Sequence, residues 1–359
     1  MVEVFAAIRT VSTKSAIFLN LLRTFPRGAD CRDPETRVPS VGPLSRDSPT
    51  ITREQSTAAR LAWGFWALVT ATTCLIVLGA LVRANGAGLA CPDWPLCFGE
   101  VIPRFDVKIA FEWGHRALAG GVGLFFLLLA ILTLRQPGLG RPLRPWLALA
   151  AVLLAVQVTL GALTVWQLLA SWTVTSHLVV GNAVNAGFAT VAYQLSRRAD
   201  GQPADDAVPK TLRNLLWLSA SLLVLQLILG GQVSSRFAGL VCDEWPACHA
   251  GAWFPSFEGA RGLHLFHRLT GYALVVSLIA TATVGRGHGR LSGLLAAAAI
   301  VGVTQAGVGV ANVLLRIPIE VTALHSLLAA ALVLLMTLAC NEGLSQERGN
   351  SPSALSQPA

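Results

Sequence analysis

The sequence has few charged residues. Asp, Glu, Lys and Arg make up 13% of its 359 positions, whereas soluble domains carry about a quarter. It lacks an aspartate-rich pair suited to magnesium diphosphate, which argues against a prenyltransferase. Its apolar stretches hold few polar residues, which argues against a transporter with a polar cavity at the membrane midplane. The net charge of +8 lies mainly between these stretches, so it predicts membrane topology and not nucleic-acid binding.

Apolar residues make up 53% of the chain and gather into blocks of about twenty residues, long enough to cross a bilayer. Backbone groups find no water at membrane depth, so the blocks must be helices. The Lys and Arg distribution favours both termini in the cytoplasm. We therefore predict an all-α integral membrane protein with eight transmembrane helices, near 62–83, 112–134, 146–168, 172–195, 212–233, 264–284, 291–314 and 319–340.

The two ends of the chain differ from the rest. Residues 1–60 are rich in Arg and Pro and have no apolar stretch of spanning length, which predicts a disordered N-terminal leader. A native extension, a mitochondrial targeting segment and an over-long start are all left open. Residues 342–359 are polar and predict a disordered tail.

An internal repeat divides the remaining chain. The segment from Gly88 to Cys97 recurs as Gly239 to Cys248, with both cysteines shifted by 151 residues. Similar shifts, of 152 and 148 residues, relate three further pairs: His115 and His267, Gln157 and Gln305, and His177 and His325. Since each copy holds four crossings, the copies share one orientation. The repeat predicts two parallel four-helix bundles, at 61–199 and 200–341.

Four histidines occupy equivalent places in the repeat. Each falls in the first two turns of an even-numbered block, at similar depth: His115, His177, His267 and His325. The second and fourth helices of a bundle can face each other, so each bundle offers two imidazoles to a haem iron. Two histidines without a nearby carboxylate or cysteine pair make a poor zinc site. Helix packing is the alternative role.

Arginines follow two of these histidines directly, at Arg116 and Arg268. A guanidinium group there could bind a haem propionate through two hydrogen bonds. It could equally extend to the membrane interface. Both roles stay open at this stage.

The two copies differ beside their first histidine. Glu112 stands three residues before His115, whereas His264 stands three residues before His267. Positions three apart share a helix face, so the first bundle alone has a carboxyl group near its haem space, suited to proton transfer. This difference predicts that the first bundle holds the reacting species and the second a resident cofactor.

Two cysteine pairs lie in loops on the predicted outer side: Cys91 with Cys97, and Cys242 with Cys248. An oxidising compartment there permits disulfides. A purely structural role suits the second pair. A structural and a redox role both remain open for the first pair, which lies just before the helix of Glu112.

Residues 62–340 resemble the haem A synthase family in the Gly88–Cys97 loop, the Glu112-x-x-His115-Arg116 motif, the paired histidines and the repeat. The resemblance implies oxidation of the C8 methyl of haem O to a formyl group by successive hydroxylations, which supplies haem A to terminal oxidases. It implies that His115 and His177 bind haem O, and that His267 and His325 bind haem B. Glu112 and the Cys91/Cys97 pair match the catalytic residues.

The expected location is a bacterial inner membrane, favoured over a mitochondrial one. The expected partners are haem O synthase and terminal-oxidase assembly factors, while the electron partner and homo-oligomer formation stay open. One alternative is a di-haem, cytochrome b-like electron-transfer subunit, which explains the histidines but not the difference between Glu112 and His264. The other is a transporter or assembly factor that binds no haem.

Overall fold

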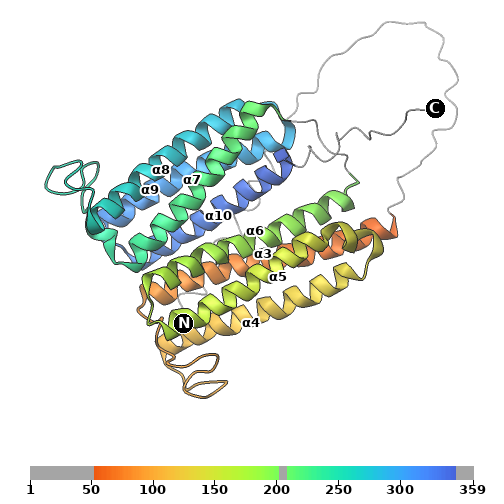
Figure 1. Ribbon diagram of the computed structural model, residues 1–359, viewed down its shortest axis with the longest axis horizontal. Helices are drawn as coiled ribbons and strands as arrows, with labels where there is room; N and C mark the ends of the chain where they lie inside the picture. Colours follow the sequence, from red (N-terminus) through yellow and green to blue (C-terminus); the bar gives the residue numbers. More distant parts are fainter. Residues whose placement is uncertain (1–51, 202–207, 345–359) are drawn as a thin grey trace, which may run out of the picture. The chain divides into compact units, whose positions relative to one another are not determined.

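The computed structural model describes residues 52–201 and 208–344, which belong to one unit of the chain, Ile51–Ala359. Eight long helices account for most of them (Figure 1), as predicted. Their bounds are α3 Arg53–Ala84, α4 Val107–Leu134, α5 Pro137–Trp166, α6 Ser171–Ala199, α7 Lys210–Ser235, α8 Gly259–Val284, α9 Gly289–Leu314 and α10 Ile319–Leu344.

The first and last helices are longer than the sequence predicted. Helix α3 begins at Arg53, because Thr52 and Gln55 form a capping box that satisfies its first backbone N–H groups. The prediction of a disordered leader up to residue 60 is therefore wrong for its last turns. Helix α10 likewise includes the first residues of the predicted tail. The rest of the leader and of the tail lie outside the described residues.

Seven of the described helices have the length and composition to cross a membrane, and α6 falls short of that measure. Polar residues lower its hydropathy, yet several of them are buried, among them Thr173, Asn182 and Asn185. Helix α6 contacts α3, α5, α7 and α10, and the Asn185 side chain donates to the Thr73 hydroxyl at 2.9 Å. Its polar groups thus face other helices, where they cost less than they would against lipid.

The helices form two consecutive sets, α3–α6 and α7–α10, which lie side by side in Figure 1. Each set contains a hydrophobic core. In the first helix group, α3–α6, Phe126 stacks on Phe188 with ring centroids 5.0 Å apart. In the second helix group, α7–α10, the core is built from leucines such as Leu216, Leu278 and Leu295. The groups meet where α3 contacts α10 and where α6 contacts α7 and α10. Their relation as a parallel repeat stays a prediction.

Candidate functional site

The four predicted histidines lie on the second and fourth helices of each group: His115 on α4, His177 on α6, His267 on α8 and His325 on α10. Helices α4 and α6 belong to the first helix group, and α8 and α10 to the second. The structure therefore places each predicted histidine pair within one helix group, and the binding of one haem by each pair stays a prediction.

Each histidine packs against a glycine of the preceding helix. A Cβ atom added at Gly79 would lie 3.1 Å from Cε1 of His115, and one at Gly230 would lie 3.1 Å from Cε1 of His267. The remaining two histidines have the same arrangement at 3.2 Å, as His177 against Gly161 and His325 against Gly309. A side chain at these positions would push the ring away, so the glycines fix where the imidazoles stand.

The polar contacts of the four imidazoles are compatible with binding a metal-containing cofactor. Within the described part of the chain, Nδ1 of all four rings is buried without a hydrogen-bond partner. The Nε2 atoms of His177 and His267 lie 3.3 and 3.5 Å from the amide nitrogens of Gln157 and Gln226. Residues 52–201 and 208–344 hold no cluster of three His, Cys, Asp or Glu able to hold a metal ion. These side chains could hold a haem iron, whereas they would make a poor zinc site built from protein alone.

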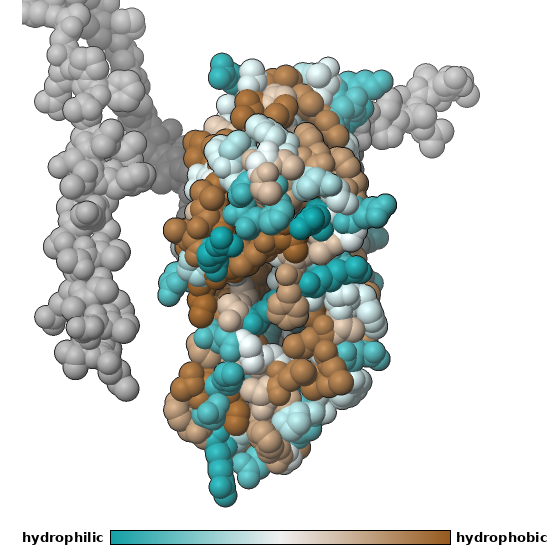
Figure 2. Space-filling view, turned by 90° about the vertical axis from the view of Figure 1, so that its left-hand side faces the viewer, coloured by the Kyte–Doolittle hydropathy of each residue, from teal (hydrophilic) through white to brown (hydrophobic). Residues whose placement is uncertain are grey.

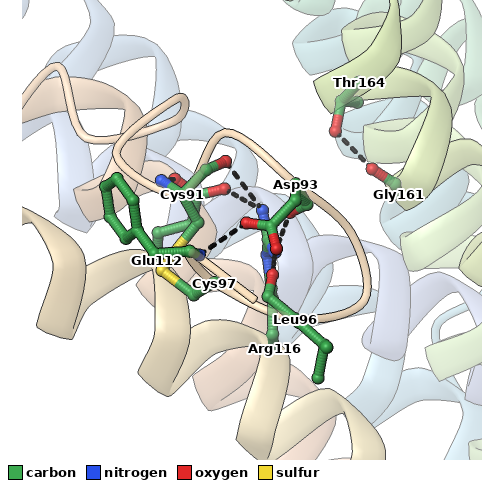
Figure 3. Close-up of polar contacts among 9 residues, drawn as sticks. Cys91, Asp93, Leu96, Cys97, Glu112, Arg116, Gly161 and Thr164 are labelled. Carbon is green, nitrogen blue, oxygen red and sulfur yellow. Dashed lines mark hydrogen bonds and ion pairs between the residues drawn. A yellow bond between two sulfur atoms is a disulfide. The ribbon is translucent and has the colours of Figure 1, made fainter. Parts of the chain in front are cut away.

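Glu112 is buried on α4, one turn before His115. Its Oε2 accepts a hydrogen bond from the backbone N–H of Cys91 at 2.9 Å, and its Oε1 pairs with Nη2 of Arg116 at 2.5 Å. Figure 3 shows the carboxylate held between the loop and the guanidinium group. At the corresponding place on α8 stands His264, which is also buried. The chemical difference between the two groups therefore lies inside the protein, not on its surface.

Arg116 and Arg268 hold the loops that precede their helices. Arg116 donates to the carbonyl oxygens of Asp93 and Leu96, both at 2.6 Å (Figure 3). Arg268 donates to three carbonyls of its own loop, at 2.7 to 3.0 Å: those of Cys242, Glu244 and Ala247. The sequence analysis considered haem propionates and the membrane interface as partners of these arginines, and it missed the loop carbonyl oxygens. Propionate binding stays a prediction.

Both predicted cysteine pairs form disulfides, Cys91–Cys97 and Cys242–Cys248. All four cysteines, which belong to these loops, are buried. Each disulfide thus closes the loop whose carbonyls the arginine binds. Figure 2 shows the end of the helices that carries these loops, where hydrophobic residues are exposed among hydrophilic ones.

Acidic residues order the same two loops. The Asp93 carboxylate accepts hydrogen bonds from the backbone N–H groups of Gly99 and Phe98, at 2.8 and 2.6 Å. These bonds, the one from Gly99 above all, hold the pKa of Asp93 below its usual value. In the second loop, a hydrogen bond with His249 lowers the pKa of Asp243. Both loops therefore keep a charged carboxylate at neutral pH.

Comparison with known proteins identifies a family for this chain. Residues 61–112 and 102–337 match the COX15-CtaA family, described as cytochrome oxidase assembly protein. The chain is similar to a protein named heme A synthase from Shewanella oneidensis, with 29% identity over 78% of this chain and 94% of that protein. It is 31% identical to the heme A synthase of Shouchella clausii, over 76% of this chain and 93% of that protein. The heme A synthase of Methylobacterium radiotolerans is 26% identical over 76% of this chain.

Proposed function

The chain belongs to the COX15-CtaA family of cytochrome oxidase assembly proteins, and from this premise we propose that it is a membrane oxidoreductase that converts haem O to haem A. The observation that carries the proposal is the buried Glu112 one turn before His115, where the second helix group has His264. Two groups with the same histidine arrangement but different neighbours suit two haems with different roles. One is altered and one is retained.

The first helix group takes haem O as substrate, between His115 and His177. The second takes haem B as a resident cofactor, between His267 and His325. The buried Nδ1 atoms and the four glycines support this division of the imidazoles into two pairs. When bound, haem B supplies one-electron redox chemistry.

Glu112 is the group on this chain best placed to act on the substrate. The N–H of Cys91 and the guanidinium group of Arg116 each bind one of its oxygens and so fix the carboxylate close to the ligand helix turn. A carboxylate held in this way can accept a proton from the C8 methyl group or offset positive charge that develops there. Two successive hydroxylations of that methyl would give a geminal diol, and loss of water would leave the formyl group. With water as the oxygen source, each hydroxylation releases two protons and two electrons, and the electrons pass to an external acceptor.

The loop over the first helix group excludes water from this carboxylate. Arg116, the Cys91–Cys97 disulfide and the two hydrogen bonds of Asp93 close the loop onto α4. A redox role for the disulfide is part of the proposal, because the amide of Cys91 is a direct neighbour of Glu112.

The bacterial relatives found in the same comparison support a location in a bacterial membrane. We place the protein in a bacterial plasma membrane with both termini in the cytoplasm, as the Lys and Arg distribution favours. The two helix groups act as parallel repeats, which is supported by their matching glycine–histidine contacts. Haem O synthase and terminal-oxidase assembly factors are the proposed partners.

The test is haem analysis of cells that express the full chain together with a source of haem O. We expect haem A in extracts of cells that express the parent chain. Glu112→Gln should reduce the amount of haem A at least about a hundredfold, because general acid–base catalysis contributes a rate factor of that size. Glu244→Gln, a carboxylate change in the second loop, is the matched control and keeps full activity. Haem B content measures folding in each case. Only haem B in the parent extract, unaffected by Glu112→Gln, would favour a di-haem electron carrier instead.

A further inference from the structure

Two of the four site histidines have an amide side chain at their Nε2 atom. The amide nitrogen of Gln157 lies 3.3 Å from Nε2 of His177, and that of Gln226 lies 3.5 Å from Nε2 of His267. A Cβ atom added at the adjacent glycine of the preceding helix would lie closer to Nδ1 than to Nε2 in both rings. Nε2 is therefore the nitrogen left for an incoming iron, and it is the nitrogen that the amide engages.

Each of these two amides is seated on a glycine that follows the histidine by four residues. A Cβ atom added at Gly181 would lie 2.9 Å from the amide nitrogen of Gln157, and one at Gly271 would lie 3.1 Å from that of Gln226. A methyl group at either position would therefore crowd the amide. The equivalent residues after the other two histidines are alanines, Ala119 and Ala329. The room for an amide is thus built at one histidine of each helix group.

The glutamines follow the internal repeat, with one exception. The residue four positions before the glycine that meets each histidine is a glutamine on three helices: Gln157, Gln226 and Gln305. On α3 this place is held by Leu75, four residues before the glycine that meets His115. Among the described residues no hydrogen bond joins Gln305 to His325, although the Oε1 atom of Gln305 is buried without a partner. His115 and His325 are thus the histidines without an amide on Nε2.

We propose that Gln157 and Gln226 compete with haem iron for the Nε2 atoms of their histidines, which makes one axial ligand in each helix group exchangeable. The inference rests on the proposed function, because it needs a haem between each histidine pair. A neutral imidazole has one nitrogen lone pair to offer, which either accepts the amide hydrogen bond or binds iron. Exchanging the two ends of the amide reverses donor and acceptor but leaves Nε2 engaged. When the bond to iron breaks, the amide takes the free nitrogen and stabilises the open state, so His177 and His267 are the ligands that leave.

An exchangeable ligand has a use in the first helix group. Haem O must enter this group and haem A must leave it, and either passage requires that bonds between iron and imidazole form or break. An amide that takes Nε2 of His177 as the iron leaves makes the release of product easier. Glu112 lies on the helix of the other ligand, His115. The porphyrin therefore stays attached beside the carboxylate while His177 opens.

The second helix group provides the test, because it contains both kinds of glutamine. The purified full chain, loaded with haem B, is mixed with an excess of an apoprotein scavenger, and haem loss is followed by absorbance. Gln226→Leu removes the competing amide and should slow haem loss about threefold to tenfold, the factor for one hydrogen bond of ordinary net strength. The matched control is Gln305→Leu, the same change at the equivalent place on α9, which should lose haem at the parent rate. Faster haem loss in Gln226→Leu, as expected for a residue that only positions the ring, would overturn the proposal.

Carbon monoxide gives a second readout that does not depend on haem loss. It binds reduced haem B only after one histidine has left the iron, so its binding rate reports how readily that ligand opens. Gln226→Leu should reduce this rate by a similar factor, whereas Gln305→Leu should leave it unchanged. A faster rate in Gln226→Leu, or the same rate in both variants, would overturn the proposal.

The outcomes separate this proposal from the proposed function. Haem A formation by the parent chain, together with equal haem B loss in Gln226→Leu and Gln305→Leu, would refute the exchange role alone. Slower haem B loss in Gln226→Leu without haem A formation by the parent chain would refute the catalysis and leave the exchange role standing.

Discussion

Two glycines on helix α9 allow the geometry of a haem ligand to be tested with a single methyl group. A Cβ atom at Gly309 would lie 3.2 Å from Cε1 of His325, whereas one at Gly307 would meet nothing within 4 Å. Both residues lie in the same helix, two positions apart. Gly309→Ala and Gly307→Ala therefore add the same atom to the same element, and only one of them crowds the imidazole.

The expected magnitude follows from two opposing effects. Replacing Gly by Ala inside a helix is favourable by about 1 kcal/mol, and both variants gain it. A crowded methyl group in a packed interior costs about 1–3 kcal/mol, and only Gly309→Ala bears this cost. The difference between the variants thus isolates the contact with His325. If this cost of about 1–3 kcal/mol applies only to the haem-bound protein, the affinity for haem B drops by roughly 5- to 150-fold.

The assay is the rate at which haem B leaves the purified protein for an excess of an apoprotein scavenger, followed by absorbance. Gly309→Ala should lose haem faster than the parent chain and show an altered haem spectrum. Gly307→Ala should match the parent chain in both. Equal haem retention and equal spectra in the two variants would refute the idea that the glycine positions His325.

Three further predictions concern the loops and the contact between helix groups. Arg268→Met removes three hydrogen bonds to its loop. Under mild reductant, the cysteines of the Cys242–Cys248 disulfide should therefore be alkylated at least about tenfold faster than in the parent chain. Arg261→Met is the control, and equal alkylation rates in the two variants would contradict the role of Arg268 in holding the loop. Since the pKa of Asp93 is lowered, its hydrogen bonds stabilise the loop above the unfolded pKa and are lost as pH falls through the folded value. The protection factors of its two amide donors against hydrogen exchange should therefore stay high at neutral pH and fall only at pH values below the usual aspartate pKa. If Asp93→Asn leaves that pH profile unchanged, the assignment is wrong. Tyr193→Phe removes a buried hydrogen bond to the Glu342 carboxylate and should lower the free energy of unfolding, measured by denaturation in detergent, by about 1–3 kcal/mol. The control Tyr272→Phe should change it by no more than about 0.5 kcal/mol. Similar losses in both variants would argue against a stabilising contact between the two helix groups.

The helices and the histidine pairs could be predicted because each depends on a local or periodic signal. Eight apolar blocks correspond to the eight long helices of the described residues, and the repeat places two histidines in each helix group. The start of α3 was misjudged because its first turns are polar. Its true signal was the capping box of Thr52 and Gln55, which hydropathy does not detect.

Other parts of the site depend on contacts between segments that are distant in sequence. Nothing near Arg116 indicates that its guanidinium group binds loop carbonyls twenty or more residues earlier. Gly79 and Gly230 were missed as partners of the histidines because a glycine in a membrane helix usually indicates only close helix packing. Their recurrence at the repeat spacing was the available signal, since they stand 151 residues apart like the cysteines.

The polar character of α6 has a consequence for how the protein is made. A segment with this many hydroxyl and amide side chains has a weak tendency to enter a bilayer by itself during synthesis. A turn of a few residues, 167–170, links it to the strongly apolar α5, so we expect the two to insert as a hairpin. Its contacts with α7 and α10 then form only after the second helix group has been synthesised. Until that point α6 has exposed polar groups in lipid, and a chain truncated after the first helix group should be a poor substrate for insertion and a good one for membrane proteases.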